Sequence, residues 1–195
     1  QMAQYSAPPL SYPLVVKTFN QEFKKSPSEM FDTFTKVAIQ AASIGQVHKA
    51  EIDGHAYAVK VQYPGVAASV SSDLKLVKPL ATRILNLKGK DIGRYFKEVE
   101  TKLLEETDYK LELKRSVLIS EACNHIENLV FPTYYPALSG DRILTMDWIE
   151  GKPLGERIKL NDIAAKEGQV LGQALWDFYH YQIHTLHSLH ADPHP

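Results

Sequence analysis

Residues 41–65, AASIGQVHKAEIDGHAYAVKVQYPG, decide the fold. The run IGQVHKAEI alternates apolar and polar residues as a half-buried strand does, and Asp53-Gly54 behind it is the strongest short signal for a two-residue hairpin turn. HAYAVKVQY then supplies the returning strand. The stretch therefore predicts an antiparallel hairpin whose second strand carries Lys60, with Val59 and Val61 pointing to the opposite face.

Helical patterns flank this hairpin. Residues 1–33 are interpreted as an N-terminal helical segment, in which Ser26 or Ser28 followed by Glu29 predicts a short capped helix. Behind the hairpin, SSDLKLVKPLATRILNL has helical apolar spacing, with Ser71 or Ser72 as its cap and Pro79 as a kink or a break. The longest helical pattern lies next, over about residues 94 to 126.

The C-terminal third predicts a second hairpin and a last helix. FPTYYPAL and DRILTMDWIEG are interpreted as two strands around a turn at Gly140-Asp141. From Asn161, the predicted cap, to about Leu189 the spacing is helical again. The order of helices, hairpin, helices, hairpin and helix predicts an α+β fold, with an antiparallel sheet and helices beside it.

Composition excludes several classes of protein. The formal net charge of −1 argues against a domain that mainly binds nucleic acid, because such domains carry a clear basic excess. The single Cys123 cannot form an internal disulfide, which favours a reducing intracellular compartment, cytoplasmic or organellar. No run approaches the roughly 18 apolar residues of a membrane span. Peripheral association with a membrane stays open as an expectation for the longer protein, although this stretch does not encode it. The start QMAQYSAPPL lacks the pattern of a signal peptide, and both ends are expected to lie inside a longer protein.

Lys60 is the first candidate for chemistry. A lysine within a strand is expensive to bury unless it is paired, so it is either an edge residue that reaches water or a phosphate-binding lysine held by a carboxylate. The acidic run EETDYKLE, residues 105–112, supplies such carboxylates. Helical spacing predicts Glu105, Asp108 and Glu112 on one face, with Glu106 to one side. The alternative is a solvated surface with pairs such as Glu106–Lys110.

The chain end offers a second candidate and a rival. In HADPH, residues 190–194, Asp192 precedes a proline and is expected to be extended at the end of a long helix. There it could position a hydroxyl or a water, or ligate Mg²⁺. His180, His184 and His187 have an i, i+4, i+7 spacing that could hold zinc, although a satisfied histidine stripe is the preferred interpretation.

Four motifs in this order resemble one family. AASIGQVHKAEIDGHAYAVKVQYPGV, LLEETDYKLE, LTMDWIEGKPL and HADPHP are similar to the UbiB-like, aarF-domain atypical kinases over about residues 30 to 195. The resemblance implies a kinase-like N-terminal lobe at 34–146 behind a helical extension at 1–33. It further implies that 147–195 forms the hinge and the first part of a truncated C-terminal lobe.

The resemblance also implies roles for individual residues. Lys60 matches the lysine on the α- and β-phosphates, Glu106 and Asp108 match the family's Glu-x-Asp motif, and Glu112 or Glu106 would orient Lys60, with Glu112 preferred. Asp192 matches the catalytic-loop aspartate. The residues that would contact the nucleotide comprise an alanine-rich loop over the phosphates, two strand positions and the hinge: Ala41, Ala42, Ser43, Ile44, Gly45, Val47, Ala58, Met146, Asp147 and Trp148.

The function is implied by the same resemblance. It would use ATP or ADP with Mg²⁺ as cofactor, in a kinase or ATPase that supports ubiquinone or lipid metabolism through a lipid or quinone-pathway partner. The metal-binding Asn and Asp motifs and the Lys-x-Gly-Gln motif are not in this sequence, and Arg115 replaces a usual Asn, so the stretch alone is expected to be inactive. An inactive kinase-like scaffold and a histidine-rich metal-binding module remain as alternatives. Alanines where kinases have glycines predict a stiffer loop that favours ADP binding or ATP hydrolysis.

Overall fold

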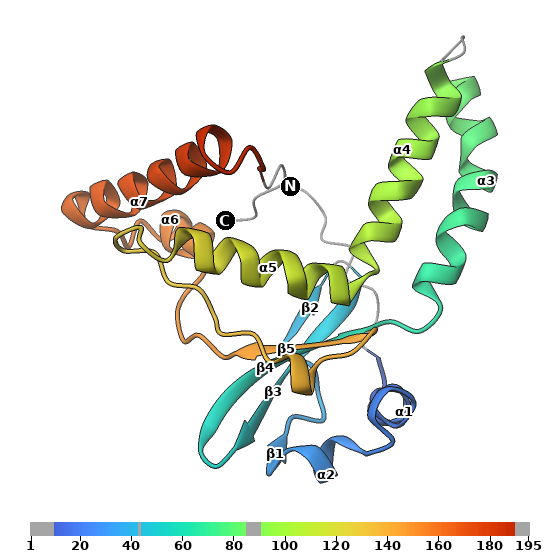
Figure 1. Ribbon diagram of the computed structural model, residues 1–195, viewed down its shortest axis with the longest axis horizontal. Coiled ribbons are helices and arrows are strands. Elements are labelled where there is room, and N and C mark those ends of the chain that lie inside the picture. The colour runs from blue at the N-terminus through green and yellow to red at the C-terminus, as the bar shows by residue number, and fades with distance from the viewer. Residues whose placement is uncertain (1–9, 43, 85–90, 190–195) are drawn as a thin grey trace. The chain divides into compact units, whose positions relative to one another are not determined.

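The computed structural model describes residues 10–42, 44–84 and 91–189, and within them the predicted α+β class is confirmed. Two helices precede four strands, and the fifth strand lies between the later helices, as Figure 1 shows. Their bounds are α1 Tyr12–Phe23, α2 Pro27–Met30, β1 Thr33–Phe34, β2 Gln40–Ala42, β3 Gly45–Ile52, β4 His55–Gln62, α3 Val66–Ile84, α4 Asp91–Glu106, α5 Tyr109–Cys123, the 3-10 helix η1 Pro136–Leu138, β5 Ile143–Asp147, α6 Leu154–Lys159 and α7 Ala165–His184.

The predicted hairpin forms as the sequence indicates. β3 and β4 pair antiparallel along their whole length, from Ile52 opposite His55 to Gly45 opposite Gln62. Asp53 and Gly54 at the turn have φ values of 51° and 77°, the left-handed geometry that a two-residue turn between twisted strands requires. Asp-Gly is therefore the local cause of the register that places Val47 opposite Lys60.

The sheet of five strands has one apolar face and one mixed face. β5 pairs with β4, while β1 and β2 pair with the two ends of β3. Alternation along β4 sends Tyr57, Val59 and Val61 into the core and Lys60 to the other face, as predicted. The core is completed by residues of α1, of the segment after α2 and of the neighbouring strands: Val15, Phe19, Phe31, Ala50 and Ile143.

The N-terminal helices lie against the apolar face (Figure 1). Ser26 precedes α2, and its backbone N–H donates to Glu29 Oε2 at 2.7 Å, so the short capped helix predicted there is confirmed. A buried polar network joins the chain ahead of α1 to the sheet: the backbone N–H of Leu10 donates to Gln46 Oε1 at 2.6 Å, and Gln46 Nε2 lies 2.8 Å from His48 Nε2. The N-terminal segment is thus bonded directly to β3.

His48 in this network has a defined tautomer. Its Nδ1 lies 2.7 Å from the carbonyl oxygen of Thr35, which can only accept, so Nδ1 carries the hydrogen and Nε2 accepts from Gln46. Its ring is fully buried and stacks on Phe34 at 4.8 Å between centroids. Burial lowers the pKa of His48, partly opposed by the hydrogen bond to Thr35.

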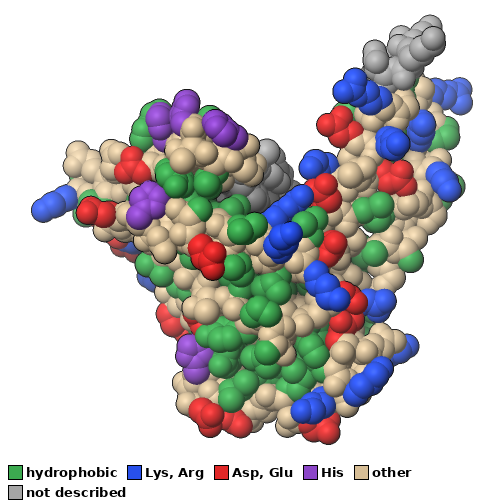
Figure 2. Space-filling model, viewed as in Figure 1, with side chains coloured by type: hydrophobic (Ala, Val, Ile, Leu, Met, Phe, Trp, Pro, Cys, Tyr) green, Lys and Arg blue, Asp and Glu red, His purple; other side chains and the backbone are tan. Residues whose placement is uncertain are grey.

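The predicted start of the helix after β4 was wrong. α3 begins at Val66, directly behind Gly65 with φ +82°, so Ser71 and Ser72 lie inside the helix and cap nothing. Pro79 does not split it, since α3 is helical from Val66 to Ile84. α3 and α4 pack against each other as a hairpin, and Figure 2 shows Lys and Arg side chains spread along it.

Two further predictions need correction. FPTYYPAL does not form a strand: a single bridge joins Tyr134 to Met146, and η1 comes next, because prolines at 132 and 136 have no N–H for a ladder. The last helix starts at Ala165 rather than Asn161, which takes φ 51° behind the unpredicted α6. It ends at His184 rather than near Leu189. The strand predicted in DRILTMDWIEG is confirmed as β5.

The chain divides into two compact units, residues 1–115 with 134–148 and residues 116–133 with 149–195. The first holds the sheet and α1 to α4. In the second, Phe131 packs on Phe178 and His125 on Tyr181, with centroids 5.7 Å and 4.7 Å apart. Cys123 belongs to this unit; it is fully buried, and burial raises the pKa of its thiol, as a packed structural cysteine requires.

Candidate functional site

The Lys60 side chain forms an ion pair on the mixed face of the sheet. Its Nζ lies 2.8 Å and 2.9 Å from the two carboxylate oxygens of Glu112, near the start of α5. The exposed fractions of the two side chains are 17% and 35%, so the ammonium is largely shielded while the carboxylate keeps contact with solvent. A half-buried lysine on a central strand thus has the carboxylate partner that its burial demands. The partner is Glu112, whereas Glu106 is exposed at the end of α4.

A break in the helix brings Glu112 to this position. Residues 94–126 do not form one helix: α4 ends at Glu106 and α5 begins at Tyr109. Asp108 Oδ1 accepts the backbone N–H of Leu111 at 2.9 Å, and so caps the new helix. Gln62 Nε2 donates to the carbonyl of Thr107 at 2.7 Å and ties the break to β4. The chain changes direction because two side chains satisfy backbone groups that a continuous helix would have paired internally.

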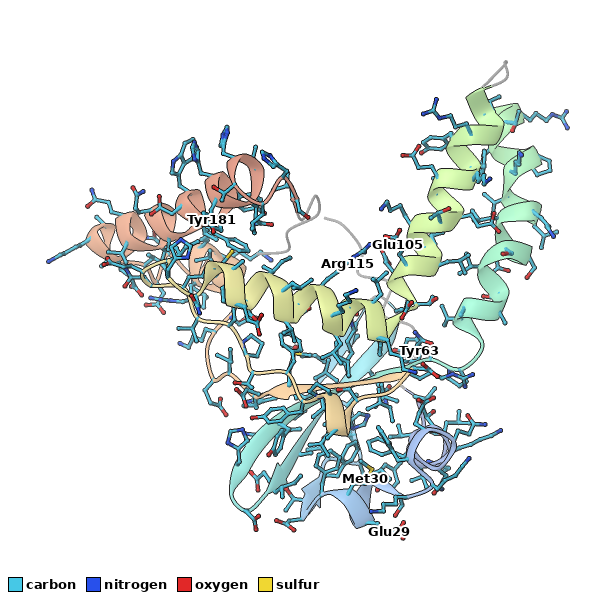
Figure 3. The ribbon with its side chains drawn as sticks, viewed as in Figure 1. Glu29, Met30, Tyr63, Glu105, Arg115 and Tyr181 are labelled. Atoms are coloured by element: carbon cyan, nitrogen blue, oxygen red, sulfur yellow. The ribbon has the colours of Figure 1, made fainter. Side chains whose placement is uncertain are left out.

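The predicted face of Glu105, Asp108 and Glu112 was therefore wrong. Glu105 lies on α4 and accepts hydrogen bonds from Arg115 at 3.0 Å and from Lys102 at 3.2 Å. Figure 3 shows the Glu105 and Arg115 side chains facing each other from α4 and α5. These bonds, Arg115 first, lower the pKa of Glu105. Arg115, where the family pattern has Asn, thus links the two helices across the break.

Tyr109 was missed by sequence reasoning although it lies within the motif LLEETDYKLE. Its ring is fully buried, and Lys60 Nζ lies 4.7 Å from the ring centroid, within the range of a cation–π contact. Its hydroxyl has no hydrogen-bond partner, alone among the buried side-chain polar atoms of the described residues. Burial, followed by the charge of Glu112 and by Tyr63, raises the pKa of Tyr109 well above its usual value. In the sequence it shows only as an aromatic residue three positions before Glu112, a spacing that ordinary core residues of a helix share.

The alanine-rich loop joins β2 to β3. Ala41 and Ala42 end β2, Ser43 lies outside the described residues, and the carbonyl of Ile44 accepts the N–H of Tyr63 at 3.0 Å. A Cβ on Gly45 would lie 2.5 Å from the carbonyl oxygen of Val61 and 2.8 Å from the Tyr109 hydroxyl. The close approach of Val61 and Tyr109 therefore leaves room only for glycine at position 45.

Strand register groups several predicted nucleotide contacts on the face of Lys60. Val47 is opposite Lys60, and Ala58 is opposite Met146, so the four side chains share that face. Ala58 is small enough to leave room above the strand next to Lys60. The grouping results from the hairpin turn and from the pairing of β5 with β4.

The hinge residues fit the expectation only in part. The backbone N–H of Trp148 donates to the carbonyl of Ala56 at 3.0 Å, so the sheet already uses that group. The Asp147 side chain lies with Tyr57 on the other face, where its Oδ1 is 2.7 Å from both the Tyr135 hydroxyl and His55 Nε2. The hydrogen bond to Asp147, followed by burial, raises the pKa of Tyr135 to about 12.

The histidine stripe does not form as predicted. His180 and His184 stack with ring centroids 4.2 Å apart, but α7 ends at His184 and His187 has φ 49°, so the three do not share a helix face. Figure 2 shows a group of histidine side chains on the surface, with other histidines apart from it. Within residues 10–42, 44–84 and 91–189, no group of three or more His, Cys, Asp and Glu side chains could hold a metal ion. Asp192 lies outside the described residues.

The comparisons with known proteins agree with the resemblance. AarF domain-containing protein kinase 1 of Xenopus laevis is 31% identical over 193 residues, 97% of this chain and 36% of that protein. The mitochondrial atypical kinase coq-8 of Caenorhabditis elegans is 34% identical over 145 residues, 73% of this chain and 18% of that protein. The chain thus spans about a third of the first of these relatives and less of the second.

A solved structure and a family model cover most of the chain. The structure of Rv3197 with erythromycin, from Mycobacterium tuberculosis, matches with a TM-score of 0.64 and 30% identity, over 78% of this chain and 39% of that one. The model of the ABC1 atypical kinase-like domain matches residues 2–195. The chain therefore belongs to the ABC1 (aarF-domain) family of atypical kinase-like proteins.

Proposed function

We propose that this chain carries the phosphate-binding lysine and its supporting sheet for an atypical kinase or ATPase that uses ATP or ADP. The observation that carries the proposal is the ion pair of Lys60 with Glu112, on strand and helix as phosphoryl-transfer enzymes of the kinase type place it. Family membership and relatives named kinases support the same class of function. The roles of individual residues belong to the same proposal.

The chemistry of the residues present supports a nucleotide as the ligand. The Lys60 ammonium is held by Glu112 and by the face of Tyr109, so its position is fixed before any phosphate arrives. Lys60 would contact the α- and β-phosphates, while Val47, Ala58 and Met146 on the same face would contact the base and sugar. Mg²⁺, when bound with the nucleotide, would neutralise phosphate charge.

The loop of residues 41–45 would determine which nucleotide binds best. Alanines restrict φ and ψ where glycines would let backbone amides close over a γ-phosphate. The proposal therefore includes a preference for ADP, or for hydrolysis of ATP, over phosphorylation of protein substrates. Replacing Ala42 by Gly in the full-length protein should raise ATP affinity or autophosphorylation, and an unchanged value of both would contradict this part.

The direct test is a thermal-shift titration of the full-length protein with ADP and ATP, with and without Mg²⁺. A ligand at 100 times its Kd stabilises by roughly 2.7 kcal/mol, which moves the melting temperature by several degrees. The shift should vanish in Lys60→Ala and remain in Lys75→Ala, a matched change of an exposed lysine on α3. Absence of a shift in the unaltered protein would favour an inactive kinase-like scaffold.

The proposal also covers the compartment in which the protein acts and the metabolism it serves. Relatives are named chloroplastic and mitochondrial, which supports an organellar protein that serves ubiquinone or other lipid metabolism. In the part of the chain that the structure describes, no helix is both long and apolar enough to span a bilayer. Imaging of the tagged full-length protein against organelle markers tests the location, and quinone content after deletion of its gene tests the metabolic role.

A further inference from the structure

Tyr109 contacts both parts of the proposed phosphate site. It is the first residue of α5, and its side chain is fully buried beneath the sheet's mixed face. The ring centroid lies 4.7 Å from Lys60 Nζ, and the hydroxyl lies where a Cβ on Gly45 would come within 2.8 Å. One side chain thus touches the phosphate lysine on β4 and the residue at which the alanine-rich loop enters β3.

The hydroxyl of Tyr109 makes no hydrogen bond with the described residues and so does not stabilise the fold through one. A buried O–H without a partner destabilises a fold, and phenylalanine would fill the same space without that cost. The ring, in contrast, has a clear purpose, because the face of an aromatic ring attracts an ammonium group that is shielded from water. The ring therefore acts on Lys60, while the hydroxyl only limits how closely the chain at Gly45 can approach.

The contacts around Tyr109 hold both its ring and the chain at Gly45 in place. Tyr109 and Glu112 are three residues apart on α5 and so approach Lys60 from the same helix face. Above the hydroxyl, Gly45 is held by its pairing with Gln62, and the carbonyl of Ile44 by the N–H of Tyr63. The loop entrance cannot move closer to Lys60 without meeting the hydroxyl.

We propose that Tyr109 is a positioning residue of the phosphate site, whose ring face holds the Lys60 ammonium in place. The proposal deepens the proposed nucleotide-binding function, and the affinity measurement described below depends on that function. The position of Lys60 can be measured without a nucleotide and so does not depend on it.

The test compares Tyr109→Leu, which removes the ring, with Tyr109→Phe, which keeps the ring and removes only the hydroxyl, in the full-length protein. Acetylation of Lys60 by an amine-reactive reagent is followed by mass spectrometry. Lys60 should be acetylated several times faster in Tyr109→Leu and at the unaltered rate in Tyr109→Phe. Tyr95→Leu, a change of an exposed tyrosine on α4, is the control and should leave the rate unchanged.

The second readout is the ratio of the Kd for adenosine to the Kd for ADP, which isolates the contribution of the phosphates. Tyr109→Leu should lower this ratio by about tenfold while adenosine still binds, since a cation–π contact in a shielded site is worth roughly 1–2 kcal/mol. Tyr109→Phe keeps the ring and should keep most of the ratio of the unaltered protein. An equal loss for adenosine and ADP, or an unchanged acetylation rate in Tyr109→Leu, would overturn the proposal. If the unaltered protein bound no ADP, the function proposed for the site would fail, while the acetylation rates would still decide the role of Tyr109.

Discussion

Lys60 and Glu112, which lie 52 residues apart in the chain, meet with both carboxylate oxygens within 2.9 Å of the ammonium nitrogen. The lysine is fixed by a hairpin turn and the glutamate by a capped helix start, so each partner is positioned by its own local structure. The pair therefore exists before ligand binding, and its strength can be measured in the free protein.

A double-mutant cycle with Lys60→Met and Glu112→Gln should give a coupling energy of about 1–2 kcal/mol, because one member is largely shielded from water; exposed pairs give about 0.2–1 kcal/mol. Urea unfolding of the four proteins supplies the free energies. Glu106→Gln is the matched control and should show no coupling to Lys60, since Glu106 is exposed on another helix. Coupling to Glu106 instead would refute the assigned pairing.

Two glycine substitutions should have opposite effects on the free energy of unfolding. Gly45→Ala should destabilise by about 1–3 kcal/mol, because the new Cβ would lie 2.5 Å from the carbonyl oxygen of Val61. Gly93→Ala on α4 should stabilise by about 0.5–1 kcal/mol, since its Cβ enters open space and alanine favours a helix. Chemical denaturation measures both, and a neutral Gly45→Ala would show that the loop can move away.

His48 should make the fold sensitive to mild acid. Burial places its folded pKa below the ordinary 6.5, so the unfolded chain takes up the proton first as the pH falls. Stability is then complete above 6.5, declines below it by at most about 1.4 kcal/mol per pH unit, and levels off beneath the folded pKa. Urea unfolding across this range should show a shallower decline in His48→Gln. The exposed His184→Gln should decline like the unaltered protein, and equal slopes in all three would rule out His48 as the cause.

Tyr135 should report on the side chain of Asp147. The pKa of Tyr135, about 12 in the folded protein, should fall toward 10.0 in Asp147→Ala, because the variant removes both the accepted hydrogen bond and the nearby negative charge. NMR titration of ring-labelled tyrosine measures it, with Tyr135→Phe to assign the resonance. A pKa that stays near 12 would mean that burial alone is responsible.

The hairpin and its face assignment were predictable because their causes are local. Alternation of side chains and an Asp-Gly turn fix which residues of β3 and β4 share a face, and Val59, Lys60 and Val61 lie as predicted. The same register places Ala58 opposite Met146, since β5 also forms from its own pattern. The position of Lys60 on the face opposite the core could thus be predicted from the sequence. The motif LLEETDYKLE also contained its ion-pair partner, Glu112.

The helix break at Thr107 and Asp108 was not predictable, because no glycine or proline marks it and the apolar spacing continues across it. Its cause includes a tertiary contact, the bond from the Gln62 side chain to the Thr107 carbonyl, which spans 45 residues. Tyr109 was missed for a related reason: a buried aromatic in a helix is indistinguishable in sequence from ordinary core, and its relation to Lys60 and Gly45 appears only when three elements meet.

The bond from Gln62 to Thr107 has a mechanical consequence for the α3–α4 hairpin. Gln62 lies two residues beyond Lys60 on β4, and Thr107 is the joint between the hairpin and the helix that carries Glu112. Because this bond holds Thr107 against β4, the end of the α3–α4 hairpin next to α5 is attached to the sheet. A force applied to this hairpin would therefore reach β4 at Gln62, two residues from the phosphate lysine.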